Sequence, residues 1–365
     1  MKTFLLVLLS LISMLFTECK KDADNPASPP QSNPHWTQIN LPLNTYVEAL
    51  VVAPSGAGDT NLYAGTVNYG VFRSSNNGTS WVTVNSGLPA IVNVVALEAI
   101  PNGFGGVNLF AGIWPTGLDT IGSVFLSTNN GSSWVSVSVG LPSSITVNSL
   151  AAATNGTNLF AGSTRGVFRS TNSGTNWTAA NAGLDTIVSS LAAVPNGAIG
   201  TNLYAATGTG VFLSTNNGAN WQSVSSGLPA NTGVGALKAY ASQTGTTTLL
   251  VGMGGDLNST RIYRSTNSGA SWALANSGLP TSVLTVVHSF AFVPAVTGET
   301  SVVTGTSLGV YRSTDNGTSW QAMNSGLTSS SASSVYVVAF ALVPNGSGGI
   351  NLFAGSNVGL WKYSL

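Results

Sequence analysis

Carboxylates are the side chains of this sequence whose chemistry is easiest to assess, because the chain has few of them. Eight acidic residues follow residue 34. Hydrolysis of a glycosidic bond requires two carboxyl groups placed about the scissile bond. Four of these acids lie outside the predicted turns and outside the strand halves farthest from the expected ligand-binding face. They are Glu48, Asp119, Asp185 and Asp256. Sequence spacing sets no distance between these candidates, so a catalytic pair among them is an open alternative.

Two arginines and one histidine are further candidates for ligand contacts. Arg165 and Arg261 fall in predicted loops and share no register with the other arginines. His288 lies in an apolar segment, where a core position and a ligand contact are equally good interpretations. The remaining arginines stand one residue before the same serine of a repeated motif, which indicates a structural role: Arg73, Arg169, Arg264 and Arg312.

Composition excludes several classes of function. Charged residues make up 6% of the chain and the formal net charge is zero, so the basic surface that nucleic-acid binding needs is lacking. One cysteine and two histidines exclude an internal disulfide framework and argue against a zinc site. No Ser-His-Asp arrangement or phosphate-binding loop is readable. We therefore expect no metal and no cofactor.

A repeated eight-residue motif organises the chain that positions these residues. The pattern is S-x-[ND]-x-G-x-x-W, and its six copies end at Trp81, Trp134, Trp177, Trp221, Trp272 and Trp320. Asn or Asp side chains bind nearby backbone amides, and glycine adopts positive φ freely, so each copy predicts a tight turn between two strands. The tryptophan is expected to begin the next strand and to pack its ring over the turn.

This motif resembles the Asp-box, or BNR, repeat of sialidase-like, sortilin-like and xyloglucanase-like β-propellers. Five copies carry Asn where that motif is named for Asp, and Asp315 is the exception. In those families the motif is a structural turn away from the ligand site, so the resemblance implies a fold rather than a ligand. Sialidases hold a substrate carboxylate with three arginines. Only two candidates exist here, so the resemblance does not extend to that chemistry.

Tryptophan spacing predicts the number of repeats. Starting from Trp36, the intervals are 45, 53, 43, 44, 51 and 48 residues, which match four-stranded propeller blades. The last repeat ends after its third strand, whereas residues 36–42 form an outer strand with no blade before it. We therefore predict an all-β, seven-bladed β-propeller over residues 35–365, closed by an N-terminal strand that completes the last blade and hides two sheet edges.

Laid over one another, the inner strands differ at two positions. The first position holds Glu48, Val95, Asn148, Ser189, Gly235, His288 and Val338. Two residues earlier stand Tyr46, Asn93, Thr146, Ile187, Gly233, Val286 and Tyr336. Both sets are expected on the face that carries the outer-to-inner and second-to-third connections, where related propellers bind ligands. Residues 114–120 and 254–261 form longer loops on that face, through either function or neutral drift. The predicted ligand-binding residues are Tyr46, Glu48, Asn93, Trp114, Asn148, Arg165, Arg261, His288 and Tyr336.

The first 34 residues resemble an export and anchoring segment. Lys2 precedes an apolar run over residues 4–16, which is too short to span a bilayer. Cys19 follows it, as in a bacterial lipoprotein signal, although Glu18 stands where a small residue is expected. An ordinary secretory signal in residues 1–19 is the alternative. Residues 20–34 contain four prolines and predict an extended tether.

These patterns favour an exported monomer, held at the outer membrane or cell surface by lipid on Cys19, or otherwise secreted. Its predicted role is that of a non-catalytic binding or assembly module for a glycan or protein ligand. A glycoside hydrolase of the sialidase-like or xyloglucanase-like type is the alternative. The third candidate is a purely structural partner-binding protein that resembles the photosystem assembly propellers. It differs from the binding module only in its ligand.

Overall fold

The computed structural model describes residues 34–365 except for a set of short segments. These segments are residues 44, 56–59, 103–105, 116–122, 154–155, 157, 185–186, 197–199, 231, 242–246, 254–260, 281–284, 295–299, 329–333 and 347. The predicted signal and tether, including Cys19, therefore lie outside the described residues. So do the candidate acids Asp119, Asp185 and Asp256.

Strands account for all the regular secondary structure of the described residues, and they occur in four sets. The inner strands are β2 (Val47–Pro54), β6 (Asn93–Pro101), β10 (Val147–Ala152), β14 (Val188–Asn196), β18 (Val234–Ala241), β22 (Val287–Val293) and β26 (Val337–Pro344). The second strands are β3 (Thr60–Thr66), β7 (Val107–Trp114), β11 (Leu159–Ser163), β15 (Gly200–Thr207), β19 (Thr247–Met253), β23 (Ser301–Thr306) and β27 (Ile350–Ser356). The third strands are β4 (Gly70–Ser74), β8 (Val124–Ser127), β12 (Gly166–Ser170), β16 (Gly210–Ser214), β20 (Ile262–Ser265), β24 (Gly309–Ser313) and β28 (Gly359–Ser364). The outer strands are β1 (Thr37–Ile39), β5 (Val82–Thr83), β9 (Val135–Ser136), β13 (Thr178–Ala179), β17 (Gln222–Ser223), β21 (Ala273–Leu274) and β25 (Gln321–Ala322).

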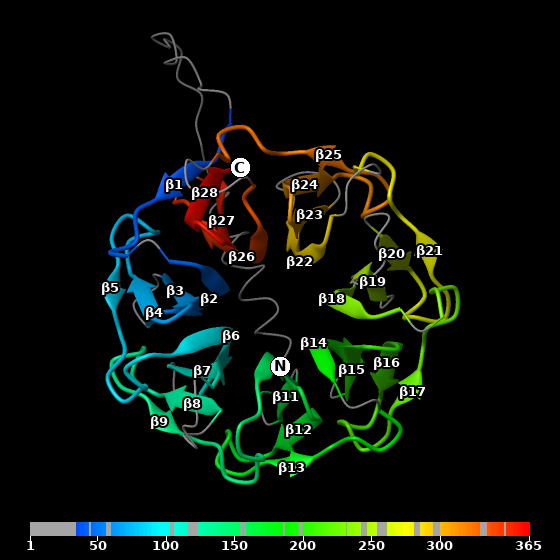
Figure 1. Cartoon of the computed structure of the whole chain (residues 1–365), viewed down its shortest axis with the longest axis horizontal. Helices are drawn as coiled ribbons and strands as arrows, with labels where there is room; N and C mark the ends of the chain where they lie inside the picture. The colour runs from blue at the N-terminus through cyan, green and yellow to red at the C-terminus, as the bar shows by residue number, and fades with distance from the viewer. Residues whose placement is uncertain are drawn as a thin grey trace, which may run out of the picture.

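These strands form seven four-stranded antiparallel sheets, the blades of a β-propeller. Blades 1 to 6 each take four consecutive strands, beginning with β2, and blade 7 has the order β1-β28-β27-β26. Each inner strand contacts the inner strands of both neighbouring blades, and β2 contacts β26, so the ring is closed (Figure 1). The predicted seven-bladed propeller is confirmed.

An N-terminal strand completes blade 7, as predicted. In the antiparallel ladder between β1 and β28, Gln38 lies opposite Trp361. The Gln38 side chain also donates a hydrogen bond from Nε2 to the carbonyl of Val358, at 2.9 Å. Figure 1 shows β1 beside β28, so segments from the two ends of the described chain share one sheet.

The repeated motif forms the tight turn that its residue types predict. In blade 2, the Gly131 N–H donates to Ser127 Oγ at 2.9 Å, and that hydroxyl donates to Asn129 Oδ1, also at 2.9 Å. The same Oδ1 accepts the Ser133 N–H at 2.9 Å. Asn130 and Gly131 have φ values of 55° and 81°, the left-handed conformation that Asn and Gly tolerate best.

The tryptophans link neighbouring blades, which is more than the predicted contact with their own turn. Trp134 begins the outer part of blade 2 and donates its indole N–H to the carbonyl of Val84 in blade 1, at 2.7 Å. Equivalent bonds start from Trp177, Trp221, Trp272 and Trp320. Trp81 is different, because its indole binds the Gly78 carbonyl of its own turn at 3.2 Å. Packing therefore joins the blades through buried indoles around the periphery of the ring.

Candidate functional site

Every inner strand carries a β-bulge near its first residue. The bulge residue occupies the variable position that was found by aligning the repeats. In blade 1, Val47 pairs with Thr66 and Ala49 pairs with Gly65, so Glu48 has no partner in the ladder. The same register shift leaves out Val95, Asn148, Ser189, Gly235, His288 and Val338 in the other blades. A bulge redirects the extra side chain without breaking the rest of the sheet. We call the face of the ring that carries these bulges the bulge face.

Each bulge is held by a buried valine that precedes it. Val47 is fully buried, and it lies against Gly355 in the second strand of the preceding blade. A Cβ added at Gly355 would come within 2.7 Å of the Val47 carbonyl oxygen and 2.8 Å of its Cγ1. Glycine and valine repeat this contact between most neighbouring blades, including Gly112 and Val147. The backbone before each bulge is therefore fixed, while the bulge residue itself is free to vary.

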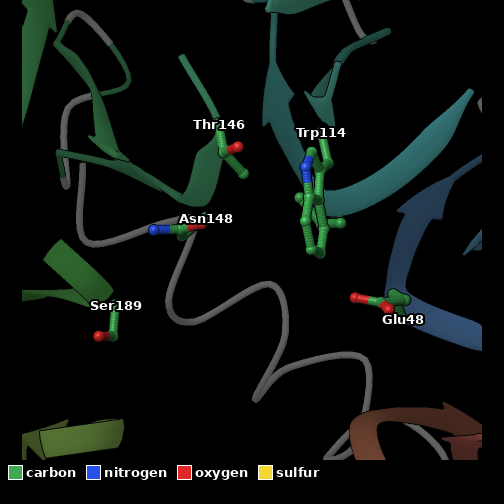
Figure 2. Close-up of a pocket in the computed structure, with 6 residues that line it drawn as sticks. Glu48, Trp114, Thr146, Asn148 and Ser189 are labelled. Atoms are coloured by element: carbon green, nitrogen blue, oxygen red, sulfur yellow. The ribbon is translucent and has the colours of Figure 1, made fainter. Parts of the chain in front are cut away.

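A cavity of ≈ 350 Å³ lies on the bulge face. It is lined by Glu48, Val95, Trp114, Thr146, Asn148 and Ser189. Four of these are bulge residues of blades 1 to 4, whereas Trp114 is the last residue of β7 and leaves 56% of its surface exposed. Figure 2 shows the Trp114 indole and the Glu48 carboxylate directed into the same space from neighbouring blades. The structure thus brings together three of the nine predicted ligand-binding residues in one pocket.

Glu48 is the charged group of this pocket. It is half-buried, and burial raises the pKa of its carboxyl group above the ordinary value of 4.5. None of the described residues forms a hydrogen bond or an ion pair with this carboxylate. A half-buried carboxylate without a partner is costly in its ionised form, so a cation or a hydrogen-bond donor would stabilise it.

An arc of aromatic residues continues from Glu48 toward blade 6. Burial, followed by the charge of Glu48 and the proximity of Tyr336, raises the pKa of Tyr46 to about 12. The rings of His288 and Tyr336 are stacked, with centroids 6.4 Å apart. His288 Nε2 is buried without a hydrogen-bond partner, and burial lowers the pKa of the imidazole. The imidazole is therefore biased toward its neutral form.

Two predicted asparagines bind the backbone, and the two predicted arginines lie apart from the pocket. Asn93 accepts the N–H of Asn68 at 2.8 Å, and Asn148 donates from Nδ2 to the Val188 carbonyl at 2.9 Å. Arg165 is exposed in the hairpin between β11 and β12, and Arg261 is half-buried immediately before β20. Neither arginine lines the cavity. The pocket lining therefore does not include these two predicted ligand-binding residues.

The repeat arginines bind structural elements, as their shared register indicates. Arg73 donates from Nη1 to the Asn130 carbonyl in the turn of the next blade, at 3.0 Å. Arg169 donates from Nε and Nη2 to Asn158 Oδ1, at 2.9 Å and 2.8 Å.

Sequence reasoning missed one charged pair, Glu98 and Lys238. These residues lie on β6 and β18, the inner strands of blades 2 and 5, which are not neighbours in the ring. Burial raises the pKa of Glu98 to about 7, against the opposing effects of Lys238 and the Ala152 backbone. The Lys238 side chain is exposed, and its charge opposes the rise in the Glu98 pKa. Both lie on inner strands, which surround the centre of the ring (Figure 1). The only sequence signal was a charge within each otherwise apolar strand.

The described residues define what chemistry the pocket offers. They include one carboxylate in the cavity, a polar set of Thr146, Asn148 and Ser189, and one exposed indole. The described part of the chain holds no group of three His, Cys, Asp or Glu residues able to hold a metal ion. Nor does that part contain a helix long and apolar enough to cross a membrane. The arrangement suits binding of a small charged or polar group.

The fold and this site define a seven-bladed β-propeller with a variable bulge face. The sequence matches the family described as the DUF6242 beta propeller domain over residues 112–363. The match covers more than half of the chain, so the protein belongs to this β-propeller family. No curated protein sequence matches the chain.

Several solved structures are similar in fold. The extracellular domain described as part of a hybrid two-component system from B. thetaiotaomicron is 14% identical, with a TM-score of 0.66 over 90% of this chain and 39% of that one. A GH74 xyloglucanase from Xanthomonas campestris is 18% identical, with a TM-score of 0.64 over 90% of this chain and 53% of the enzyme. YCF48 bound to a D1 peptide is 16% identical, with a TM-score of 0.61 over 92% of this chain and 98% of YCF48. The chain thus spans about half or less of the first two proteins. At these identities the likeness concerns the fold alone.

Proposed function

We propose that this protein is a non-catalytic binding or assembly module that holds a glycan or protein ligand on its bulge face. The observation that carries the proposal is the cavity beside the exposed Trp114, built from bulge residues that the fold leaves free to vary. An exposed indole next to polar side chains is a common element of recognition sites. It buries a large apolar surface on binding, and its rigid ring loses little conformational freedom. One described carboxylate, Glu48, falls short of the pair that glycoside hydrolysis needs.

The comparisons agree with this proposal without deciding the ligand. YCF48 is described as bound to a peptide, and the B. thetaiotaomicron neighbour is described as an extracellular domain. A hydrolase is the second candidate, because the xyloglucanase shares the fold and because the raised pKa of Glu48 is typical of a general acid.

Arrays of glycans and of peptides, probed with the purified protein, test this proposal. We expect binding without cleavage, and Trp114→Ala should weaken it because the indole provides the exposed apolar face of the pocket. Val82→Ala is the control, since Val82 is 53% exposed on an outer strand far from the cavity lining. Products of every hit are then analysed. Turnover of a polysaccharide would replace the binding module with the hydrolase, and no hit in either array would contradict both.

We further propose that the protein is exported and anchored through lipid on Cys19. The apolar run over residues 4–16 and the lone cysteine after it support this proposal. Wild-type protein should partition with membranes, and Cys19→Ala should release it, because stable attachment needs the acyl chains on that residue. Equal membrane recovery of both proteins, or a mature N-terminus elsewhere, would exclude the lipoprotein.

A further inference from the structure

The geometry points to a cationic side chain of a protein partner, a lysine or an arginine, as the group that enters the cavity beside Glu48 and Trp114. This inference rests on the proposed binding function and specifies the ligand class. The pocket supplies an anion, an aromatic face, neutral acceptors and an apolar wall, and each of these matches one part of such a side chain.

Charge is the first argument. Glu48 faces the cavity, is half-buried, and has no hydrogen-bonding or ion-pair partner among the described residues. The described residues that line the cavity include no lysine and no arginine. A cation that enters the pocket therefore meets a negative charge that no described residue pairs with. It meets no positively charged side chain among the described lining residues. Attraction in a partly desolvated site is stronger than at an open surface.

Aromatic contact is the second argument. Trp114 lines the same cavity from the adjacent blade and is 56% exposed, so its surface is available to a ligand. Figure 2 shows its indole reaching toward the space in front of Glu48. Ammonium and guanidinium groups are attracted to the face of a tryptophan, and more strongly where water is partly excluded.

The remaining wall distinguishes a long cationic side chain from a sugar. Val95 is the bulge residue between Glu48 and Asn148 in the ring, and it gives the cavity an apolar patch. Lysine and arginine place an apolar stem against such a patch while the charged head reaches an anion. Thr146 and Ser189 offer hydroxyl oxygens as acceptors for the remaining N–H donors. The hydroxyl groups of a neutral glycan can donate hydrogen bonds to Glu48, but they bring no opposite charge to it.

Small probes test the inference on the full chain. Nα-acetyl-lysine amide and Nα-acetyl-arginine amide are titrated while tryptophan fluorescence is followed, with Nα,Nε-diacetyl-lysine amide and Nα-acetyl-citrulline amide as uncharged counterparts. We expect the cationic probes to bind and the uncharged ones to bind at least about tenfold more weakly, as for loss of a charge-assisted contact. Peptides that differ only in one lysine should show the same order.

Matched variants separate the pocket charge from the overall charge. Glu48→Gln should weaken binding of the cationic probes about tenfold or more. Asp315→Asn removes one negative charge from a turn where the other five copies of the motif carry Asn, so it should leave binding unchanged. Should Glu48→Gln fail to fold, Val95→Lys tests the same point, because its own ammonium would occupy the cavity and compete with the probe.

The outcomes are distinct for the two proposals. Binding of cationic probes that Glu48→Gln or Val95→Lys abolishes supports the inference. Binding of a neutral glycan or an uncharged peptide that Glu48→Gln leaves intact overturns the inference, while the binding module stands. Preferential binding of an amino sugar over every lysine and arginine peptide also overturns it, in favour of a glycan. Lack of binding to the cationic probes overturns the inference alone, whereas lack of any hit in the arrays overturns the binding module.

Discussion

The indole of Trp36 donates its N–H to the carbonyl of Met323, at 2.6 Å and across 287 positions of the sequence. Trp36 lies in blade 7 and Met323 directly follows the outer strand of blade 6. Five tryptophans of the repeated motif make the same bond to the blade before them. Trp36 makes it without the motif, so the ring closes with the same inter-blade contact that joins most of its other blades.

Replacing Trp36 with Phe should loosen this closure. The indole is 1% exposed, so Trp36→Phe leaves the partly buried Met323 carbonyl unpaired, which costs about 1–3 kcal/mol of folding stability. Amide hydrogen exchange should become faster in β1 and β28. Trp221→Phe is the matched control, because its indole makes the same bond between blades 3 and 4 and lies in a core cluster that includes no residue of β1 or β28. Unchanged protection of β28 in Trp36→Phe would refute a closing role for this bond.

Removing residues 35–42 should have a larger effect, since blade 7 then loses β1 and exposes the edge of β28. Unpaired edge strands bind other chains, so we expect aggregation and a lower thermal midpoint, measured by light scattering and calorimetry. Deleting residues 20–27 of the predicted tether, which are equal in number, is the control. An unaltered midpoint after the first deletion would show that β1 is dispensable.

Glycine at the blade contacts should resist enlargement. Gly355→Ala places a methyl group 2.7 Å from the Val47 carbonyl oxygen, so the two blades must separate, at a cost of about 1–3 kcal/mol. Gly235→Ala is the control, because a Cβ at this bulge position meets no atom closer than 3.9 Å. Chemical denaturation of both variants compares them. Equal midpoints would mean that the close approach at Gly355 does not limit packing.

Glu98 should make stability depend on pH. Its pKa is raised from 4.5 to about 7 in the folded protein, so the folded state binds more protons than the unfolded state between these values. Stability therefore falls as pH rises through this window, and the penalty is absent below it. Glu98→Gln should be more stable than wild type at pH 8 by at most about 3 kcal/mol, with little advantage at pH 4. Loss of the attraction to Lys238 reduces this gain.

Urea titrations across this pH range measure the difference between the two proteins. A constant difference from pH 4 to pH 8 would contradict a raised pKa at Glu98. Glu48→Gln should show the same direction of change, because burial also raises the pKa of that carboxyl group.

The sequence alone was enough to predict the ring, because the turns that separate its strands are encoded by neighbouring residues. Asn130 and Gly131 sit in a turn that their residue types favour, and the Trp36 position is fixed by its spacing from Trp81. The same alignment picked out Glu48 and Asn148 as members of one variable position. It did not reveal why that position varies, because a β-bulge is a property of hydrogen-bond register between strands rather than of residue type.

Long-range relationships were out of reach for the same reason. Glu98 and Lys238 influence each other across the centre of the ring, although no local pattern connects them. The repeat alignment placed Thr146 and Ser189 on this face without naming them as ligand-binding residues, and the structure shows that both line the cavity. The roles proposed for Asp119, Asp185 and Asp256 remain predictions, as these residues lie outside the described segments.

The pairing of β1 with β28 also sets an order of events during synthesis. Gln38 emerges from the ribosome early, whereas its partner Val358 lies 320 positions later. Gly355, which contacts Val47, is made at the same late stage. Blades 1 to 6 consist of consecutive strands and can assemble as they emerge. β1 must wait unpaired until β28 has been made. Closure of blade 7 therefore cannot precede the synthesis of β28, however stable the other blades are.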